Sequence, residues 1–202
     1  MKRDAKLLLL VAVLLYSTIF TFVESNANIF GMNIIQNAAG IALLATFIIL
    51  YSLANGLKPK IRAKFMAAFA SLGVIFSILM TYAHYASASE FCPKVGGGQV
   101  PCDIVNQSIY AEIMGVPVAV FGIIGYAVMA YVAWCQANPK KKFEILKNPL
   151  TLHILAVLAL LFAVYLNYIQ FAILKTLCLF CEMSAGTVIT LTLISYQNWR
   201  GE

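Results

Sequence analysis

Charged side chains are scarce in this sequence. They make up only 11% of its 202 residues, whereas hydrophobic side chains make up 62%. A soluble domain carries about 25% charged residues, so the composition excludes a water-soluble globular protein. The net charge of +6 comes from basic residues in short segments between apolar runs, which also argues against a nucleic-acid-binding surface.

Six long stretches of the chain are almost free of charge. They are residues 7–23, 38–55, 65–86, 115–134, 150–174 and 179–199. A bilayer crossing needs about 20 residues, so the sequence predicts an all-α polytopic membrane protein with six transmembrane helices and no room for a separate soluble domain. The first run could instead be a signal peptide with a poor cleavage site, but its length favours an uncleaved anchor.

Basic residues lie almost entirely on one side of the predicted membrane. Twelve Lys and Arg residues fall on the side that holds both termini, and only Lys94 and Lys175 fall on the other. Short basic segments stay in the cytoplasm, so we expect both termini to be cytoplasmic.

Four of the five cysteines fall on the outer side in this topology. Cys92 and Cys102 lie in one loop, and Cys178 and Cys181 form a CxxC sequence where the last helix begins. Disulfides persist in oxidising compartments outside the cytoplasm, so this distribution indicates two redox-active pairs. The fifth, Cys135, is most simply a small apolar residue.

The CxxC sequence has the spacing of an exchange pair. Cys178 stands at a predicted helix start, where unpaired N–H groups and the helix dipole favour a thiolate, and Lys175 would stabilise it further. Cys181 is about 60° away around the helix, so both sulfurs can share a face. We expect Cys178 to face water and Cys181, one turn deeper, to face lipid.

The loop at 87–112 holds the other pair. Gly96, Gly97 and Gly98 form a mobile tether beside Cys92. Asp103 is a good N-cap for an amphipathic helix over 104–113 on the membrane surface, which places Cys102 just before a helix start. Four sulfurs could then pass electrons from water toward lipid by successive exchange.

These motifs resemble those of the vitamin K epoxide reductase family, in its bacterial and archaeal branch. The similarity covers roughly residues 65–199 and includes a loop cysteine pair, CD-x-V, a serine six residues after the second loop cysteine, a GVP helix start and LC-x-x-CE. The resemblance implies a four-helix bundle around a quinone at its outer end. It also implies that Cys181 is the quinone-proximal sulfur, Cys178 its exchange partner, Cys102 the loop thiol that attacks Cys178, Cys92 the thiol that meets the protein partner, and Ser108 a pocket serine.

Two departures from the family pattern concern the substrate. Animal members that reduce the epoxide carry a tyrosine one turn after the CxxC, where this sequence has Ala185. They also carry an asparagine near the start of the second bundle helix, where this sequence reads MGVP at 114–117. Both differences argue against epoxide reduction.

The ends of the chain set the expected domain organisation. Prokaryotic members often carry a fused thioredoxin-like domain, but here the last predicted helix ends almost at residue 202, so we expect a soluble extracytoplasmic thioredoxin-fold partner in trans. Residues 65–202 would form the catalytic bundle, with its cysteine loop at 87–112. Residues 1–64 would add two transmembrane helices of unknown role.

A few other polar residues lie at or near membrane depth. Asn167 and Gln170 are three residues apart near the outer end of the fifth apolar run. Such groups are usually functional or bonded to neighbouring helices, so Asn167 either donates to a quinone carbonyl or forms an interhelical hydrogen bond. Tyr82, His84 and Tyr85 are more simply an aromatic belt at the membrane interface.

Three alternatives compete with a redox relay. Zinc would need a second close-spaced pair, whereas nine residues separate Cys92 from Cys102. Inert structural disulfides are rarely needed in a membrane bundle, and outward transport of reducing power would require a cytoplasmic partner for Cys135.

The sequence therefore predicts a thiol:quinone oxidoreductase of a prokaryotic cell membrane, without a metal site. It would oxidise the thioredoxin-fold protein, reduce a quinone of menaquinone or ubiquinone type, and so support disulfide bond formation. The predicted catalytic residues are Cys92, Cys102, Cys178 and Cys181, and the predicted quinone contacts are Ser108, Asn167, Gln170 and Ala185.

Overall fold

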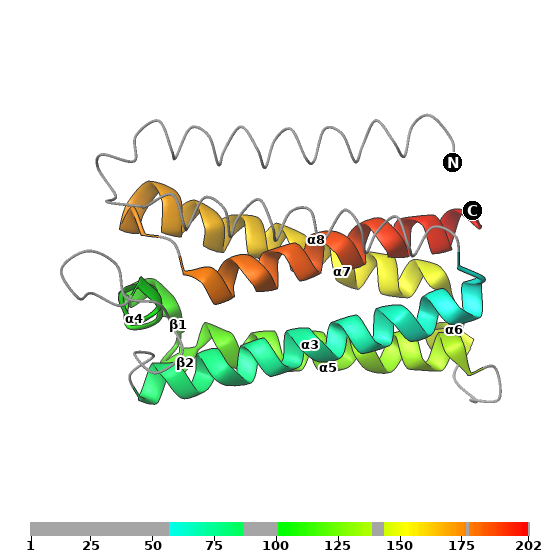
Figure 1. Ribbon diagram of the computed structural model, residues 1–202, viewed down its shortest axis with the longest axis horizontal. Coiled ribbons are helices and arrows are strands. Elements are labelled where there is room, and N and C mark those ends of the chain that lie inside the picture. The colour runs from blue at the N-terminus through cyan, green and yellow to red at the C-terminus, as the bar shows by residue number, and fades with distance from the viewer. Residues whose placement is uncertain (1–56, 87–100, 139–143, 177, 202) are drawn as a thin grey trace.

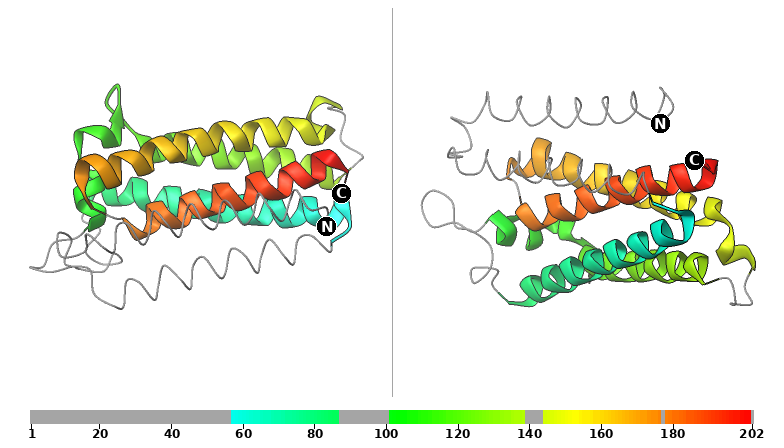
Figure 2. Two further views of the ribbon diagram at one scale, coloured as in Figure 1. Left: turned by 90° about the horizontal axis from the view of Figure 1, so that it is seen from above. Right: turned by 45° about the vertical axis from the view of Figure 1, so that its right-hand side comes forward.

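Four long helices lie along a shared axis in the computed structural model, which describes residues 57–86, 101–138, 144–176 and 178–201 (Figures 1 and 2). They are α3 (Pro59–Tyr85), α5 (Val118–Ala137), α7 (Pro149–Tyr168) and α8 (Leu179–Arg200), and a short helix, α6 (Glu144–Lys147), precedes α7. α3 packs against α5 and α8, and α7 packs against α8 and α5, so the four helices close a ring. The predicted spans at 7–23 and 38–55 lie outside the described residues.

Local sequence signals set several helix ends. Pro59 occupies the first turn of α3, where its missing N–H costs no hydrogen bond. The Asn148 side chain accepts a hydrogen bond from the backbone N–H of Leu150 (3.0 Å) and caps α7. Gly201 adopts φ of 70° and ends α8 in the left-handed conformation that favours glycine. α3 therefore begins at Pro59 rather than at residue 65.

The segment between α3 and α5 differs from the prediction. It forms α4 (Pro101–Asn106), a 3-10 turn (Ile109–Ala111) and a hairpin of β1 (Glu112–Ile113) and β2 (Val116–Pro117). The predicted amphipathic helix over 104–113 is wrong. α4 ends at Asn106, and Glu112 and Ile113 pair with β2 across a turn at Met114 (φ 55°) and Gly115 (φ 79°). For the same reason α5 begins at Val118 rather than at residue 115. Asp103 lies inside the first turn of α4 instead of capping a helix, and Cys102 lies within α4.

Three helices in the described part of the chain are long and apolar enough to cross a membrane. They are α3, α5 and the span Pro149–Leu174, which joins α7 to a π-helical segment at Ile169–Leu174. α8 is 22 residues long but is rich in hydroxyl side chains. Thr187, Thr190 and Thr192 are buried and donate to carbonyls four residues earlier, so these hydroxyls are satisfied within α8. The chain is an integral membrane protein, and the total of six spans stays a prediction.

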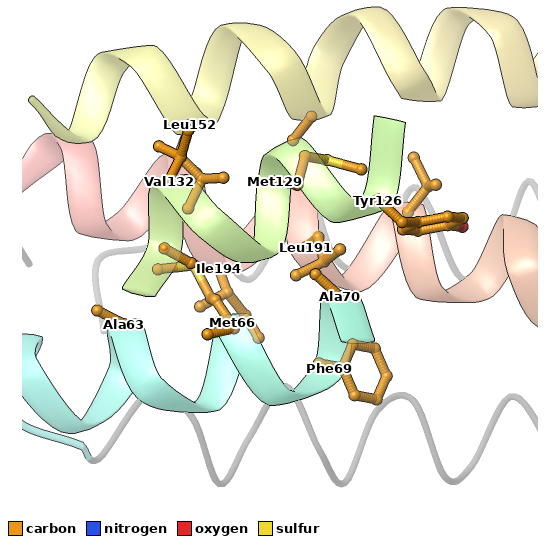
Figure 3. Packing of buried hydrophobic residues seen from close by; sticks show 14 of the residues in the cluster. Ala63, Met66, Phe69, Ala70, Tyr126, Met129, Val132, Leu152, Leu191 and Ile194 are labelled. Atoms are coloured by element: carbon orange, nitrogen blue, oxygen red, sulfur yellow. The ribbon is translucent and has the colours of Figure 1, made fainter. Parts of the chain in front are cut away.

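Small and large apolar side chains alternate in the core of the bundle (Figure 3). The small ones allow the helix backbones to approach closely, as in other membrane bundles. The larger ones fill the space between all four helices. Core members include Ala63, Met66, Ala70, Met129, Val132, Ala133, Leu152, Ala156, Leu191 and Ile194.

One close approach in the bundle is testable. A Cβ atom at Gly73 of α3 would lie only 2.3 Å from Cδ1 of Tyr126 on α5. We expect Gly73→Ala to lower the free energy of unfolding by about 1–3 kcal/mol, the usual cost of overpacking, and to lower the Tm of the purified protein. Gly125→Ala is the matched control, because nothing lies within 4 Å of a Cβ there. Equal shifts in Tm for the two variants would contradict this packing.

Candidate functional site

Three of the predicted site cysteines meet at the end of the bundle that carries α4 and the hairpin (Figure 1). Cys102 of α4 and Cys178, just before α8, are fully buried. They belong to one cluster with Met80 and Ala83 of α3, and Cys181 packs against it. The fold therefore brings the loop sulfur and the CxxC sulfurs into one small volume. The predicted site residue Cys92 lies outside the described residues.

The sulfurs of this cluster are in different oxidation states. Cys102 is disulfide-bonded, and its partner lies outside the described residues. Cys178 and Cys181 are free thiols. The structure therefore combines an oxidised loop cysteine with a reduced CxxC pair.

Cys178 occupies the N-cap position of α8, as predicted. A hydrogen bond with the Cys181 thiol favours the Cys178 thiolate and lowers its pKa below the ordinary value of a cysteine. This effect comes from Cys181 and not from Lys175, whose side chain is exposed. The expectation that Cys178 faces water is wrong: the side chain is 0% exposed, and its Sγ lies 3.9 Å from Sδ of Met80.

Gln170 holds the chain segment that leads into the CxxC. Its side-chain oxygen accepts a hydrogen bond from the backbone N–H of Cys178 (3.1 Å), and its backbone carbonyl accepts one from the N–H of Thr176 (3.1 Å). Lys175 between them adopts φ of 50°, which closes the turn from α7 to α8. Gln170 is one of the predicted quinone contacts, and its side-chain oxygen is thus engaged by the protein itself.

We expect Gln170→Leu to loosen this turn. The substitution leaves the Cys178 N–H buried without an acceptor, which costs about 1–3 kcal/mol, so the Tm should fall by several degrees. Gln136→Leu is a suitable control, since the Gln136 amide donates to the Asn148 carbonyl at an exposed position. A Tm shift no larger for Gln170→Leu than for Gln136→Leu would contradict a structural role for this hydrogen bond.

A cavity of about 160 Å³ opens beside Cys181. An apolar protein cavity of about 150 Å³ holds a benzene ring, so this one is large enough for a single aromatic ring. Its wall is mostly apolar and includes Phe76, Phe162 and Phe180. All four residues that the sequence assigns to quinone contact lie in the wall, namely Ser108, Asn167, Gln170 and Ala185. Cys181 lines the cavity as well, and Cys178 is not among its lining residues.

The polar groups of the cavity wall are few and mostly bonded to the protein. Ser108 Oγ donates to the carbonyl of Val105 (2.8 Å). Asn167 Nδ2 donates to the carbonyl of Ala163 (2.9 Å) in its own helix, and not to a neighbouring helix. Asn167 Oδ1 is buried and has no hydrogen-bond partner among the described residues. Such an orphaned acceptor is what a hydroxyl group of a bound ring would satisfy.

Tyr126 and Ser184 are among the polar wall residues that the sequence did not predict as part of the site. Tyr126 of α5 lines the cavity, and its hydroxyl lies 2.8 Å from both the carbonyl and Oγ of Ser184 on α8. This contact ties the two helices together one turn below Cys181. A tyrosine in the middle of an apolar run was the available signal, because a buried tyrosine hydroxyl usually requires a partner.

Comparison with protein-family models matches residues 64–196 to one described as the vitamin K epoxide reductase family. The chain belongs to this family. The matched region runs from α3 to α8 and contains every described residue of the candidate site, so the family assignment made from the cysteine motifs is confirmed. Vitamin K epoxide reductase family members are membrane oxidoreductases that use quinones, and this chain is accordingly a redox enzyme.

Proposed function

We propose that this vitamin K epoxide reductase family member is a prokaryotic thiol:quinone oxidoreductase. It takes two electrons from a soluble extracytoplasmic thioredoxin-fold protein and gives them to a lipid-soluble quinone. The partner's two thiols become a disulfide, and the quinone becomes a quinol. The partner is thereby reoxidised and can form disulfides in its clients.

The observation that carries this proposal is the placement of the sulfurs relative to the cavity. Cys181 lines a cavity of about the size of one aromatic ring, whereas Cys178 is buried in the same cluster as Cys102. A sulfur that reduces a ring must reach the ring, and a sulfur that exchanges with the loop must reach the loop. The two members of the CxxC are therefore suited to different steps.

We infer the following electron path. The partner's dithiol reduces a disulfide between Cys92 and Cys102 by thiol–disulfide exchange. The Cys102 thiolate then attacks Cys178 of a Cys178–Cys181 disulfide, and Cys181 leaves as a thiolate. Cys92 attacks Cys102 next, which restores the loop disulfide and releases Cys178. The two CxxC thiols finally pass two electrons and two protons to the quinone and form a disulfide again.

The described oxidation states fit one point on this path. An oxidised Cys102 beside a reduced Cys178–Cys181 pair is the state after the loop cysteines have reduced the CxxC and before the CxxC reduces the quinone. The lowered pKa of Cys178 also suits a sulfur that leaves as a thiolate when Cys92 attacks Cys102.

The substrate is a quinone rather than an epoxide in this proposal. Ala185 is buried in the cavity wall and offers only a methyl group where epoxide-reducing relatives have a tyrosine hydroxyl. The site would face the outside of the cell membrane, with both termini in the cytoplasm, because twelve of the fourteen Lys and Arg residues favour that orientation.

The direct test uses the purified full-length protein in detergent with a reduced thioredoxin-fold protein and either ubiquinone or menaquinone. We expect one quinol for each disulfide formed in the partner. The change in the ultraviolet absorbance of the quinone measures the amount of quinol formed. The matched control is Cys135→Ser, since Cys135 is a buried free thiol of α5 with no part in the path. No quinone consumption with either quinone would favour the alternative in which the outer cysteines form inert disulfides or a metal site.

A further inference from the structure

Met80 of α3 borders both the cavity and the buried sulfur cluster. Its side chain is buried, lines the cavity and packs in the same cluster as Cys102 and Cys178. In the described part of the chain, the buried members of that cluster are Met80, Ala83, Cys102 and Cys178. Of these, Met80 is the one that lines the cavity. Met80 therefore forms part of the boundary between the cavity and the buried sulfurs.

The Met80 thioether touches the exchange sulfur directly. Its Sδ lies 3.9 Å from Sγ of Cys178, which is a van der Waals contact that leaves no room for a further atom between them. Cys178 is fully buried and does not line the cavity, whereas Cys181 does. Met80 thus stands between the cavity and Cys178, and it leaves Cys181 open to the cavity.

The backbone of Met80 is held in place by α4. The Asn106 side chain donates to the Met80 carbonyl (2.7 Å), and both groups are buried. One helical turn later on α3, Nδ1 of His84 lies 2.7 Å from the Asn106 carbonyl oxygen. The His84 side chain is only 10% exposed, so it belongs to this contact and its assignment to an aromatic belt is wrong. These contacts fix the position from which the Met80 side chain extends.

The chemistry of the CxxC alone does not direct a ring to Cys181. Both sulfurs can share one face of the helix start. Cys178 has the lowered pKa, and the thiolate is the nucleophilic form of a cysteine. An electrophilic ring with access to both sulfurs would therefore react readily with Cys178, the sulfur that must stay available to Cys102. Selection of Cys181 requires a steric element beside Cys178.

We propose that Met80 is a positioning residue whose side chain separates Cys178 from the cavity and so restricts a bound ring to Cys181. In the final step of the path, the CxxC dithiol loses two electrons and two protons, the quinone gains both, and the ring meets the pair from the Cys181 side. The meaning of the separation for quinone reduction rests on the function proposed above. The separation itself does not.

The test replaces the quinone by N-methylmaleimide, a small ring that alkylates thiols. The full-length protein in detergent, with its CxxC reduced, receives a limiting amount of the reagent. Tandem mass spectrometry of the peptide that holds both CxxC cysteines then gives the ratio of label on Cys178 to label on Cys181. The variants are Met80→Ala, Met80→Leu and Met66→Ala. Met66 is the matched control, because it is fully buried in the bundle core and does not line the cavity.

We expect Met80→Ala to raise the ratio of Cys178 to Cys181 label at least roughly tenfold, because access through the cavity replaces the local opening that a buried thiol otherwise requires. Met80→Leu should stay within about twofold of the unaltered protein, since a side chain of similar volume refills the space. Met66→Ala removes the same atoms from another part of the core and should also leave the ratio nearly unchanged.

An unchanged ratio in Met80→Ala would overturn the proposal. A rise in Met80→Leu or Met66→Ala equal to that in Met80→Ala would overturn it too, because filling of this particular space would not be what protects Cys178. Cys135 serves as the internal measure of folding, since it is a fully buried free thiol of α5. If strong Cys135 labelling shows that Met80→Ala unfolds, Met80→Val, which leaves a smaller gap, decides in its place.

This assay contains neither quinone nor protein partner. A failure of the separation is therefore distinct from a failure of the proposed enzymatic function, which the quinone assay decides.

Discussion

Cys181→Ser is expected to abolish quinone reduction with every electron donor. Cys181 is the described cysteine that lines the cavity, so without its sulfur the CxxC can neither reduce the ring nor form its own disulfide. Loss of an essential sulfur of this kind lowers turnover by roughly a thousandfold or more. The measurement is the rate of quinone absorbance change with a reduced thioredoxin-fold protein, and separately with a small dithiol.

The contrasting variant is Cys92→Ser. On the proposed path it blocks electron entry from the protein partner, but it leaves part of the oxidation of small thiols intact, because a small thiol can reduce the inner cysteines without the loop. Cys135→Ser should retain full activity with both donors. If Cys181→Ser and Cys92→Ser lowered the rates equally with every donor, the assignment of quinone reduction to Cys181 and of electron entry from the protein partner to Cys92 would be wrong.

Much of the candidate site followed from local features of the sequence. The CxxC at a helix start and the two amides near the end of α7 follow from spacing along one element, whereas Ser108 followed from the resemblance to the family. All of them lie in the cavity wall or beside it. The helices of the bundle were located because long apolar runs have few alternatives in a membrane. Their ends shifted where a local conformation intervened, as at Gly115, whose φ of 79° makes the hairpin turn before α5.

The features that were missed depend on contacts between distant parts of the chain. The burial of Cys178 requires Met80, which lies 98 residues away in the sequence. The environment of His84 requires Asn106 and Glu112, which are 22 and 28 residues away. No periodicity or propensity specifies such pairs, and an aromatic belt was the simpler interpretation of the TYAHY sequence. The Asn167 amide likewise donates to a carbonyl of its own helix and not to a neighbouring helix, while its contact with a quinone stays a prediction.

A mixed disulfide between Cys102 and Cys178 is expected to accumulate when the other member of each pair is removed. In Cys92→Ala with Cys181→Ala, a Cys102–Cys178 bond has no neighbouring thiol to resolve it. Both sulfurs are fully buried in one cluster, so a mild oxidant that accepts two electrons should join them in nearly all molecules. Mass spectrometry of peptides prepared without reduction would detect the link.

Cys135 provides an internal control in the same molecule. It lies sixteen residues after Ala119, which packs against the cysteine cluster, and this separation is about 24 Å along α5. A disulfide requires Cα atoms within about 7 Å, so Cys135 should remain a free thiol after the same oxidation. Cys102 and Cys178 both found free, or either of them linked to Cys135, would contradict the relay, because the exchange step requires these two buried sulfurs to meet.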